Sequence, residues 1–253
     1  MEIDWKITSS DKRHVKDFLN AHDNNPFVLR RIQRNIKNQS PSISKERLWH
    51  VLVLCLLTTQ QRSGPDSNVF KFLRTKPFPL SYETCRSKHN VEKFSYQTLS
   101  TFKAARWPNK VASQIATNLT LLEKGLWAET LANLKTLQKG TTRDLEKSVA
   151  TFIDKNFKGF GPKQSRNFLQ ELGLSRYEIP IDSRITKWLK DFKFPVALSA
   201  AALGDKDYYN FVSDAIQKLC KDCDIYPCVL DAAIFASFDG DRWTKSNVDL
   251  SSV

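Results

Sequence analysis

Residues 157–163 read Phe-Lys-Gly-Phe-Gly-Pro-Lys, and we expect the chain to be organised around this short stretch. Helical patterns of apolar residues precede it at 144–156 and follow it at 163–172. Gly159 and Gly161 allow the backbone to take positive φ angles and another backbone to approach closely. Pro162 suits the first turn of a helix, where its missing N–H group costs nothing. The stretch therefore predicts a helix, a hairpin and a second helix.

Two polar residues accompany the hairpin. Lys163 lies on the first turn of the second predicted helix, where free N–H groups form a natural seat for phosphate. Asp182 follows later, after Pro180, and opens the next helical pattern. Each has an ordinary structural interpretation: the lysine as a phosphate-binding or solvated side chain, and the aspartate as a helix cap. Their combination with the hairpin is far more specific than a Gly-x-Gly pair alone.

This passage resembles the helix-hairpin-helix (HhH-GPD) DNA glycosylase superfamily, whose hairpin reads roughly Leu-Pro-Gly-Val-Gly-x-Lys and whose later loop reads Val-Asp-x-His. The resemblance covers roughly residues 45–240, with the compact prokaryotic 8-oxoguanine DNA glycosylase/AP lyases as the closest group. It implies that Lys163 and Asp182 are catalytic and that the hairpin glycines, Gly159 and Gly161, contact DNA. The sequence departs from the pattern at Phe157-Lys158 and at Arg184, which replaces the histidine. We assign Arg184 to a DNA phosphate.

The chemistry of these two residues is consistent with that family. An amine attacks only when it is unprotonated, and burial or a nearby cation lowers its pKa and frees the lone pair. Attack by Lys163 on C1′ of a deoxyribose would expel the base and leave a Schiff base, which can eliminate the 3′ phosphate. A carboxylate such as Asp182 would stabilise the oxocarbenium-like cation that forms as the glycosidic bond breaks. By the resemblance, the lysine implies lyase as well as glycosylase activity.

Further DNA contacts are assigned by resemblance and by charge. The family inserts a polar side chain from the loop after a buried helix into the gap left by the extruded nucleotide, and Gln60 matches that position. Gln61 is the neighbouring alternative, and either could instead be a solvated loop residue. Arg106 and Lys110, which open another helical pattern, are general candidates for phosphate binding.

Asp231 and Phe235 lie one turn apart on the last predicted helix and therefore on one face. Family members that act on 8-oxoguanine present a polar group and an aromatic ring at such a pair, which bind the edge and the face of the base. Phe235 could instead be a core residue, because the same helix carries Leu230, Ile234 and Phe238. Asp231 is harder to place in a core, since a buried carboxylate needs a partner.

Composition agrees with a polyanionic partner. The 253-residue chain carries 39 Lys and Arg against 27 Asp and Glu, a formal net charge of +12. This excess suits double-stranded DNA, although charge alone would equally fit a basic soluble protein. No apolar run approaches the ~20 residues that span a bilayer, and the N-terminus does not resemble a signal peptide. We expect an intracellular monomer without membrane contact, located in the cytoplasm and nucleoid or in the nucleus.

The five cysteines do not indicate a disulfide framework. Cys220, Cys223 and Cys228 are spaced like metal ligands, but a closed zinc or iron–sulfur site needs about four ligands and no fourth follows nearby. Buried thiols on helices are the alternative interpretation. We expect no metal and no cofactor, with a monovalent cation at the hairpin as the one exception considered.

Strand patterns are scarce, so the sequence predicts an all-α fold. The resemblance implies two helical domains with a DNA-binding cleft between them. By resemblance, residues 45–172 form a central domain whose helix-hairpin-helix motif covers 144–172. Residues 1–44 and 173–253 form the second domain. The expected function is excision of 8-oxoguanine from duplex DNA in base-excision repair. The alternatives are a glycosylase for oxidised pyrimidines or alkylated purines, and a non-catalytic hairpin protein that only binds DNA.

Overall fold

The computed structural model describes residues 5–38, 40–61, 63–240 and 242–248, and all regular elements in these ranges are helical. The predicted all-α class is confirmed. The elements are α1 (Ser9–Asn20), α2 (Pro26–Ile32), the π-helix η1 (Gln33–Lys37), α3 (Lys45–Leu57), α4 (Asn68–Leu73), α5 (Tyr82–Arg86), α6 (Val91–Thr101), α7 (Pro108–Leu121), the π-helix η2 (Leu122–Leu126), α8 (Trp127–Gln138), α9 (Arg143–Asn156), α10 (Pro162–Leu172), α11 (Ser183–Asp191), the 3-10 helix η3 (Ala200–Gly204), α12 (Lys206–Asp222) and α13 (Pro227–Asp239). None of the described helices is long and apolar enough to cross a bilayer.

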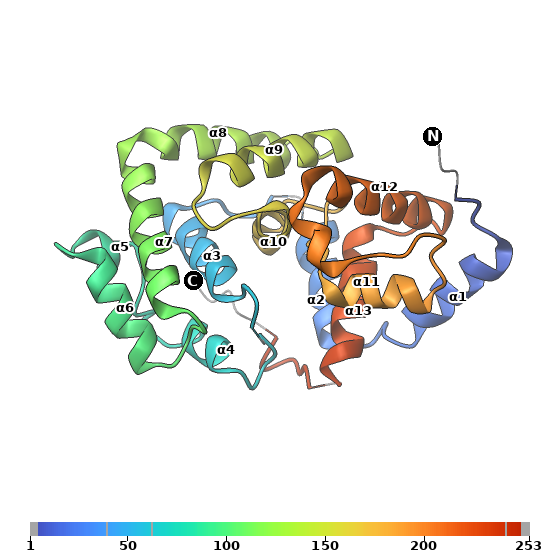
Figure 1. Cartoon of the computed structure of the whole chain (residues 1–253), viewed down its shortest axis with the longest axis horizontal. Helices are drawn as coiled ribbons and strands as arrows, with labels where there is room; N and C mark the ends of the chain where they lie inside the picture. Colours follow the sequence, from blue (N-terminus) through green and yellow to red (C-terminus); the bar gives the residue numbers. More distant parts are fainter. Residues whose placement is uncertain (1–4, 39, 62, 241, 249–253) are drawn as a thin grey trace.

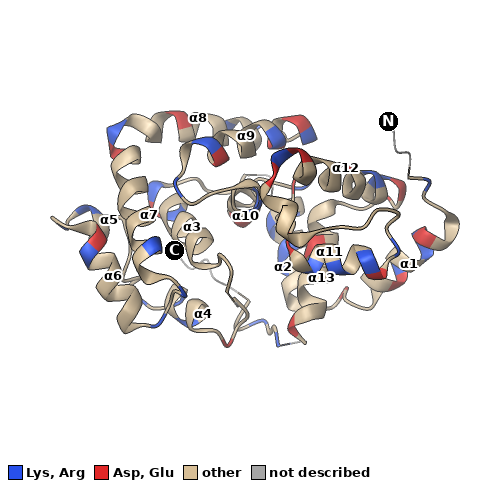
Figure 2. Ribbon diagram, in the orientation of Figure 1, with Lys and Arg blue, Asp and Glu red and all other residues tan. Residues whose placement is uncertain are grey.

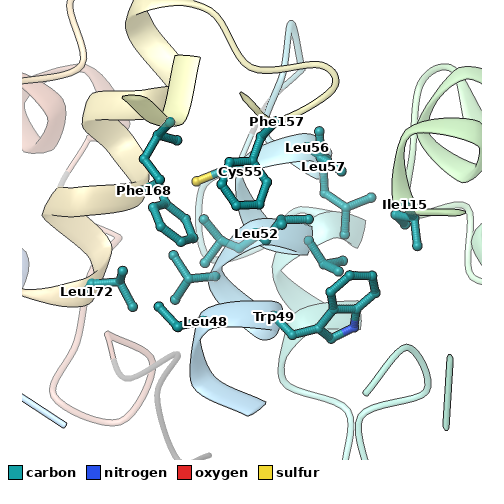
Figure 3. Packing of buried hydrophobic residues seen from close by; sticks show 14 of the residues in the cluster. Leu48, Trp49, Leu52, Cys55, Leu56, Leu57, Ile115, Phe157, Phe168 and Leu172 are labelled. Atoms are coloured by element: carbon teal, nitrogen blue, oxygen red, sulfur yellow. The ribbon is translucent and has the colours of Figure 1, made fainter. Parts of the chain in front are cut away.

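The helices gather in two halves, with α3 to α9 in one, α1, α2 and α11 to α13 in the other, and α10 between them (Figure 1). Helix α3 is the centre of the first half, because all its residues from Leu48 to Leu57 are buried. Nine of these ten residues are apolar, the exception being His50, and a helix that is apolar on nearly every side is expected to be buried. Leu52 lies in this core, Phe157 of the hairpin and Phe168 of α10 lie beside α3, and Ile115 packs from α7 (Figure 3). The hairpin is thus built onto the first core.

The second half has its own apolar clusters. The larger joins Val15 of α1 to residues 179–234, and a smaller one joins Val28 of α2 to α13. The first core, by contrast, draws its buried residues from positions 48–174. The exact domain boundaries, 45–172 against the two flanking segments, stay a prediction.

The hairpin between α9 and α10 is fixed by α7. Asn118 accepts a hydrogen bond from the backbone N–H of Lys158 at 2.7 Å and donates one to its carbonyl at 2.9 Å. Gly159 has φ +86°, and a Cβ there would lie 2.4 Å from the side chain of Gln114. Gly161 has φ −146°, which is extended backbone, so the expectation of a positive φ at both glycines is wrong for Gly161. Nothing lies within 4 Å of its Cβ position, and the hairpin there is open to a ligand.

These two glycines give a matched prediction about stability. Gly159→Ala is expected to destabilise the fold by about 1–2 kcal/mol, because Ala is strained at that φ and its Cβ displaces Gln114. Gly161→Ala is expected to stay within about 0.5 kcal/mol of the parent, because its backbone is extended and its Cβ meets open space. Thermal unfolding of the two variants measures the difference. Equal losses of stability in the two variants would contradict this description of the hairpin.

A buried carboxylate ties α9 to the segment that leads to Asp182. The side chain of Glu146 is fully buried and accepts hydrogen bonds from the backbone N–H groups of Arg176, Tyr177 and Glu178 at 2.8–2.9 Å. Burial raises the pKa of Glu146, although these donors oppose the shift. Arg166 of α10 adds a second tie, a buried ion pair with Glu178 at 2.8 Å. The helices of the hairpin therefore position the start of α11, where Asp182 lies.

Candidate active site

A groove of about 940 Å³ lies where the two halves meet, at the start of α10. It is lined by all the residues predicted to contact DNA: Gln60, Gln61, Arg106, Lys110, Gly159, Gly161 and Arg184. Lys163 and Asp182 line it as well. Lys and Arg occur on both halves of the molecule (Figure 2). The residues that line the groove include four cations and only two carboxylates, those of Asp182 and Asp239, so the groove is basic.

A second, narrower pocket of about 80 Å³ adjoins the groove. Lys163, Asp182 and Arg184 line both cavities and therefore stand where one opens into the other. The inner walls come from α10 and from α13, which contributes Asp231 and Phe235. The structure thus brings together the predicted catalytic pair and the predicted base pocket, whose members come from distant parts of the chain.

Lys163 is the second residue of α10 and is partly buried at this junction. Burial lowers its pKa, because it removes the ammonium from water, and the positive charge of Arg184 lowers it further. The carboxylate of Asp182 acts in the opposite direction. The balance leaves the pKa of Lys163 below the ordinary lysine value, which increases the fraction of neutral amine near pH 7. A neutral amine is the form that attacks an electrophilic carbon.

Asp182 caps α11. Its Oδ1 accepts hydrogen bonds from the backbone N–H groups of Arg184 at 2.9 Å and Ile185 at 3.4 Å, and its Oδ2 accepts from the Arg184 guanidinium at 2.6 and 3.0 Å. Burial alone would raise the pKa of Asp182, but Arg184 and Lys163 outweigh it and hold the pKa below the ordinary value. The carboxylate is therefore ionised and fixed in direction. The capping role and the proposed catalytic role are compatible, because the cap fixes the oxygen atoms.

Asp231 and Phe235 both line the pocket, and each contacts other protein groups there. Asp231 is buried, with its Oδ2 3.0 Å from Nη1 of Arg31. Burial raises its pKa, and Arg31 opposes the shift. The ring of Phe235 stacks on Phe27 at a centroid distance of 4.6 Å, and the guanidinium of Arg184 lies 4.1 Å from the Phe235 centroid. A base that enters between these groups would stack on Phe235 by displacing one of them.

Comparison with solved structures identifies the fold. The 8-oxoguanine DNA glycosylase of Thermotoga maritima has a TM-score of 0.67 and 20% identity to this chain, and the match covers 91% of this chain and 98% of that one. The 8-oxoguanine glycosylase/lyase of Methanocaldococcus jannaschii, solved in complex with a 15mer DNA containing 8-oxoguanine, has a TM-score of 0.66 at 16% identity over 92% and 100% of the two chains.

The chain has the fold of the 8-oxoguanine DNA glycosylases. A third structure, the 8-oxoguanine DNA glycosylase of Methanocaldococcus jannaschii, matches with a TM-score of 0.60 and 18% identity over 93% of this chain and 98% of that one. No protein-family model and no curated protein matches the sequence. At these identities the likeness establishes the glycosylase fold, and the roles of individual residues depend on the geometry of this chain.

Within this glycosylase fold, the structure distinguishes the two glutamines after α3. The side chain of Gln61 donates to the carbonyl of Leu57 and accepts from the backbone N–H of Arg106 at 2.9 Å, so it holds two loops together. The side chain of Gln60 is exposed at the groove. Of these two candidates for the predicted insertion, Gln60 is therefore the one whose side chain is free of the loop contacts that hold Gln61. Trp107, which is 53% exposed at the same groove, was not found from the sequence.

The cysteines with metal-like spacing are buried thiols. Cys220 and Cys228 are fully buried, and burial raises the pKa of Cys228 to about 12. No group of three or more His, Cys, Asp or Glu side chains within the described ranges is placed to hold a metal ion. A monovalent cation at the hairpin stays a prediction.

Several pocket residues were missed by sequence reasoning. Asn167 and Gln170 line the pocket from α10, and Phe27 and Arg31 line it from α2. The first two stand four and seven positions after Lys163, and helical periodicity places such residues on one face. That signal could have found them. Nothing in the sequence connects α2 to the pocket, because that contact depends on how α2 packs against α13.

The depressed pKa of Lys163 gives a pH prediction. Replacing Arg184 by Gln removes a positive neighbour that lowers the pKa of Lys163, so that pKa rises. The predicted Schiff base requires the neutral amine, so its formation would increase with pH through this pKa. The pH of half-maximal trapping by borohydride on an abasic duplex is therefore expected to move upward in R184Q. Lys190→Gln removes a charge from the same helix outside the pocket and should leave the midpoint in place. A downward or absent shift in R184Q would contradict this electrostatic account.

Proposed function

We propose that this protein is a DNA glycosylase with AP lyase activity, which excises an oxidised purine from duplex DNA as a monomer. The observation that carries the proposal is the position of Lys163. Its amine has a lowered pKa, interacts with the ionised Asp182, and stands where a basic groove opens into a narrow pocket. A helix-hairpin-helix protein that only binds DNA would need the groove but neither the pocket nor this amine.

The groove suits duplex DNA and the pocket suits one extruded base. The open backbone at Gly161 and the N–H groups at the start of α10 can accept a phosphate, as helix N-termini do. An enzyme that acts on a base in a duplex must turn the nucleotide out of the stack. Gln60, exposed at the groove, is placed to fill the gap. The extruded base would then pass between Lys163 and Asp182 into the pocket.

The reaction follows from this placement. The Nζ of Lys163 forms a bond to C1′ while the bond from C1′ to the base breaks, and the base leaves with the electron pair and takes up a proton. The sugar ring then opens, O4′ receives a proton that Nζ loses, and the C1′–Nζ bond becomes an iminium. Removal of a C2′ proton expels the 3′ phosphate. Asp182 stabilises the positive charge that develops on the sugar as the base departs.

Three observations support 8-oxoguanine as the base. The solved structures with this fold are described as 8-oxoguanine glycosylases, and one of them contains DNA with that lesion. Asp231 offers hydrogen-bond acceptors inside the pocket. Phe235 offers an aromatic ring on the same face of α13. Oxidised pyrimidines and alkylated purines are the alternative substrates within this reaction class.

Release of the free base tests the proposal. Duplexes that carry one 8-oxoguanine, one oxidised pyrimidine or one alkylated purine are incubated with the protein, and the released base is measured by chromatography. We expect release of 8-oxoguanine at a rate well above that of the other two bases. Preferred release of a pyrimidine would retain the glycosylase chemistry and overturn the assigned base. Binding to all three duplexes without release of any base would favour the non-catalytic alternative.

A further inference from the structure

Three residues of α10 mark the depth of the pocket. Lys163, Asn167 and Gln170 recur at helical spacing on one face and all line the pocket. Lys163 also lines the groove, whereas Gln170 does not. Lys163 therefore stands at the mouth of the pocket, and Gln170 stands two turns farther in. A base whose sugar is held at Lys163 would point its far edge towards Gln170.

The amide of Gln170 is an anomaly for a structural residue. The side chain is 0% exposed, and neither Nε2 nor Oε1 has a hydrogen-bond partner among the described residues. A buried polar group without a partner costs about 1–3 kcal/mol. The carboxylate of Asp231 is close enough for the amide to lower the pKa of Asp231, but the two groups do not meet in hydrogen-bonding geometry. An amide donor and an amide acceptor therefore remain unused at the inner end of the pocket.

Asp231 leaves a second acceptor beside this amide. Its Oδ2 is held by Nη1 of Arg31, whereas its Oδ1 makes no hydrogen bond with the part of the chain that the structure describes. Arg31 is itself buried and also lies 3.6 Å from Glu171. The carboxylate of Asp231, which lines the pocket, is thus fixed by a buried network through one oxygen and leaves the other without a described partner. The inner end of the pocket offers a free acceptor next to a free amide.

We propose that Gln170, together with Asp231, reads the Watson–Crick edge of an extruded guanine-type base. This inference rests on the proposed function and assigns the substrate class. The edge of guanine, and of its 8-oxo form, presents two adjacent donors, N1–H and N2–H, beside one acceptor, O6. Oδ1 of Asp231 accepts from the donors, and Nε2 of Gln170 donates to O6. The binding of such a base supplies partners for Oδ1 of Asp231 and for Nε2 of Gln170.

The same arrangement rejects other bases. Adenine-type bases have an amino donor where guanine has O6, so the donor of Gln170 would meet another donor. They also have an acceptor at N1 where guanine has N1–H, so the acceptor of Asp231 would meet another acceptor. A thymine-derived base has carbonyl oxygens on both sides of its single N–H, and one of them would face the carboxylate. A buried polar group that a wrong substrate leaves unpaired is a strong source of discrimination. Selectivity for guanine over other bases then depends on the Watson–Crick edge, and not on the opposite edge that carries the 8-oxo group.

Replacing Gln170 by Leu tests this assignment, because the change has opposite expected effects on stability and on excision. Leu fills similar space without polar atoms, so the melting temperature should stay the same or rise. Excision of 8-oxoguanine should fall about 10- to 100-fold in single turnover, since the contact with O6 is lost. Excision of 8-oxoadenine, which has the same oxidised edge and lacks O6, should not fall. The ratio of the two excision rates should therefore decrease.

Two controls separate this assignment from its alternatives. Gln217 is a buried glutamine of α12 whose amide donates to the carbonyl of Tyr177, so Gln217→Leu should lower the melting temperature and keep the excision ratio. Gln170→Met repeats the apolar change with a flexible side chain, in case the Leu variant folds poorly. Trapping on an abasic duplex, which contains no base to read, should match the parent in both Gln170 variants.

The proposal is overturned if the Gln170 variants excise 8-oxoguanine at the parental rate, because the amide then makes no contact with the base. It is also overturned if 8-oxoguanine excision, 8-oxoadenine excision and abasic trapping all fall together, because that pattern indicates a general defect. Failure of the proposed function itself would be recognised differently. In that case the parent protein would release no base and form no adduct with an abasic duplex.

Discussion

Replacing Lys163 by Gln is expected to abolish the covalent adduct with DNA and to lower base excision by roughly 10³-fold or more. Gln has no amine that can attack C1′, and its amide cannot form an iminium. The neutral form of Lys163 is favoured by burial and by Arg184, and the substitution removes that nucleophile entirely. The measurement is single-turnover release of 8-oxoguanine together with borohydride trapping.

DNA binding should survive this change. Lys163 is one of four cations in the groove, so its loss should weaken binding to the duplex by about 10-fold at most. Lys155→Gln serves as the matched control, because Lys155 is exposed on α9 outside the groove and the pocket. It should form the adduct and excise the base as the parent does. An adduct formed by K163Q in the parental amount would show that another residue is the nucleophile.

Asp182→Asn is expected to separate the two activities. Excision of 8-oxoguanine should fall by roughly 10³-fold, because the negative charge that stabilises the developing cation is removed. Adduct formation on a duplex with a ready-made abasic site should fall less than about 10-fold, since no base has to depart there. Asp182 also raises the pKa of Lys163, so its neutralisation leaves the amine at least as available as before. The two rates are measured on matched duplexes.

The capping role of Asp182 is tested in the same experiment. Asn caps helices about as well as Asp, so D182N should keep the cap of α11 and change stability little apart from the lost ion pair with Arg184. Asp182→Ala removes both the cap and the charge, and its free energy of unfolding should be about 1 kcal/mol lower than that of D182N. If D182N excised the base at the parental rate, Asp182 would be a helix cap only.

The local parts of the fold could be predicted from the sequence. Gly159, Gly161 and Pro162 marked the hairpin, and apolar periodicity placed α9 and α10 within one residue of their observed starts. The separation of Lys163 from Asp182 agreed with the family pattern, and the structure places both at one junction. These features were accessible because each depends on short-range rules of turns, caps and helix periodicity.

The inner pocket could not be predicted in the same way. Asp231 and Phe235 were found as a pair on one helix face, but their partners Arg31 and Phe27 come from α2, far away in sequence. The unpaired state of Gln170 is a property of packing, because an identical glutamine with a nearby carbonyl would be satisfied. Such facts depend on how helices from both ends of the chain meet.

Borohydride trapping on a duplex with a single 8-oxoguanine tests the central claim most directly. The trapped complex is digested, and the residue that carries the reduced sugar is identified by mass spectrometry. We predict an adduct with the parent protein on Nζ of Lys163 and no adduct with K163Q. Base release without any trapped adduct, or a sugar attached to a residue other than Lys163, would contradict the account.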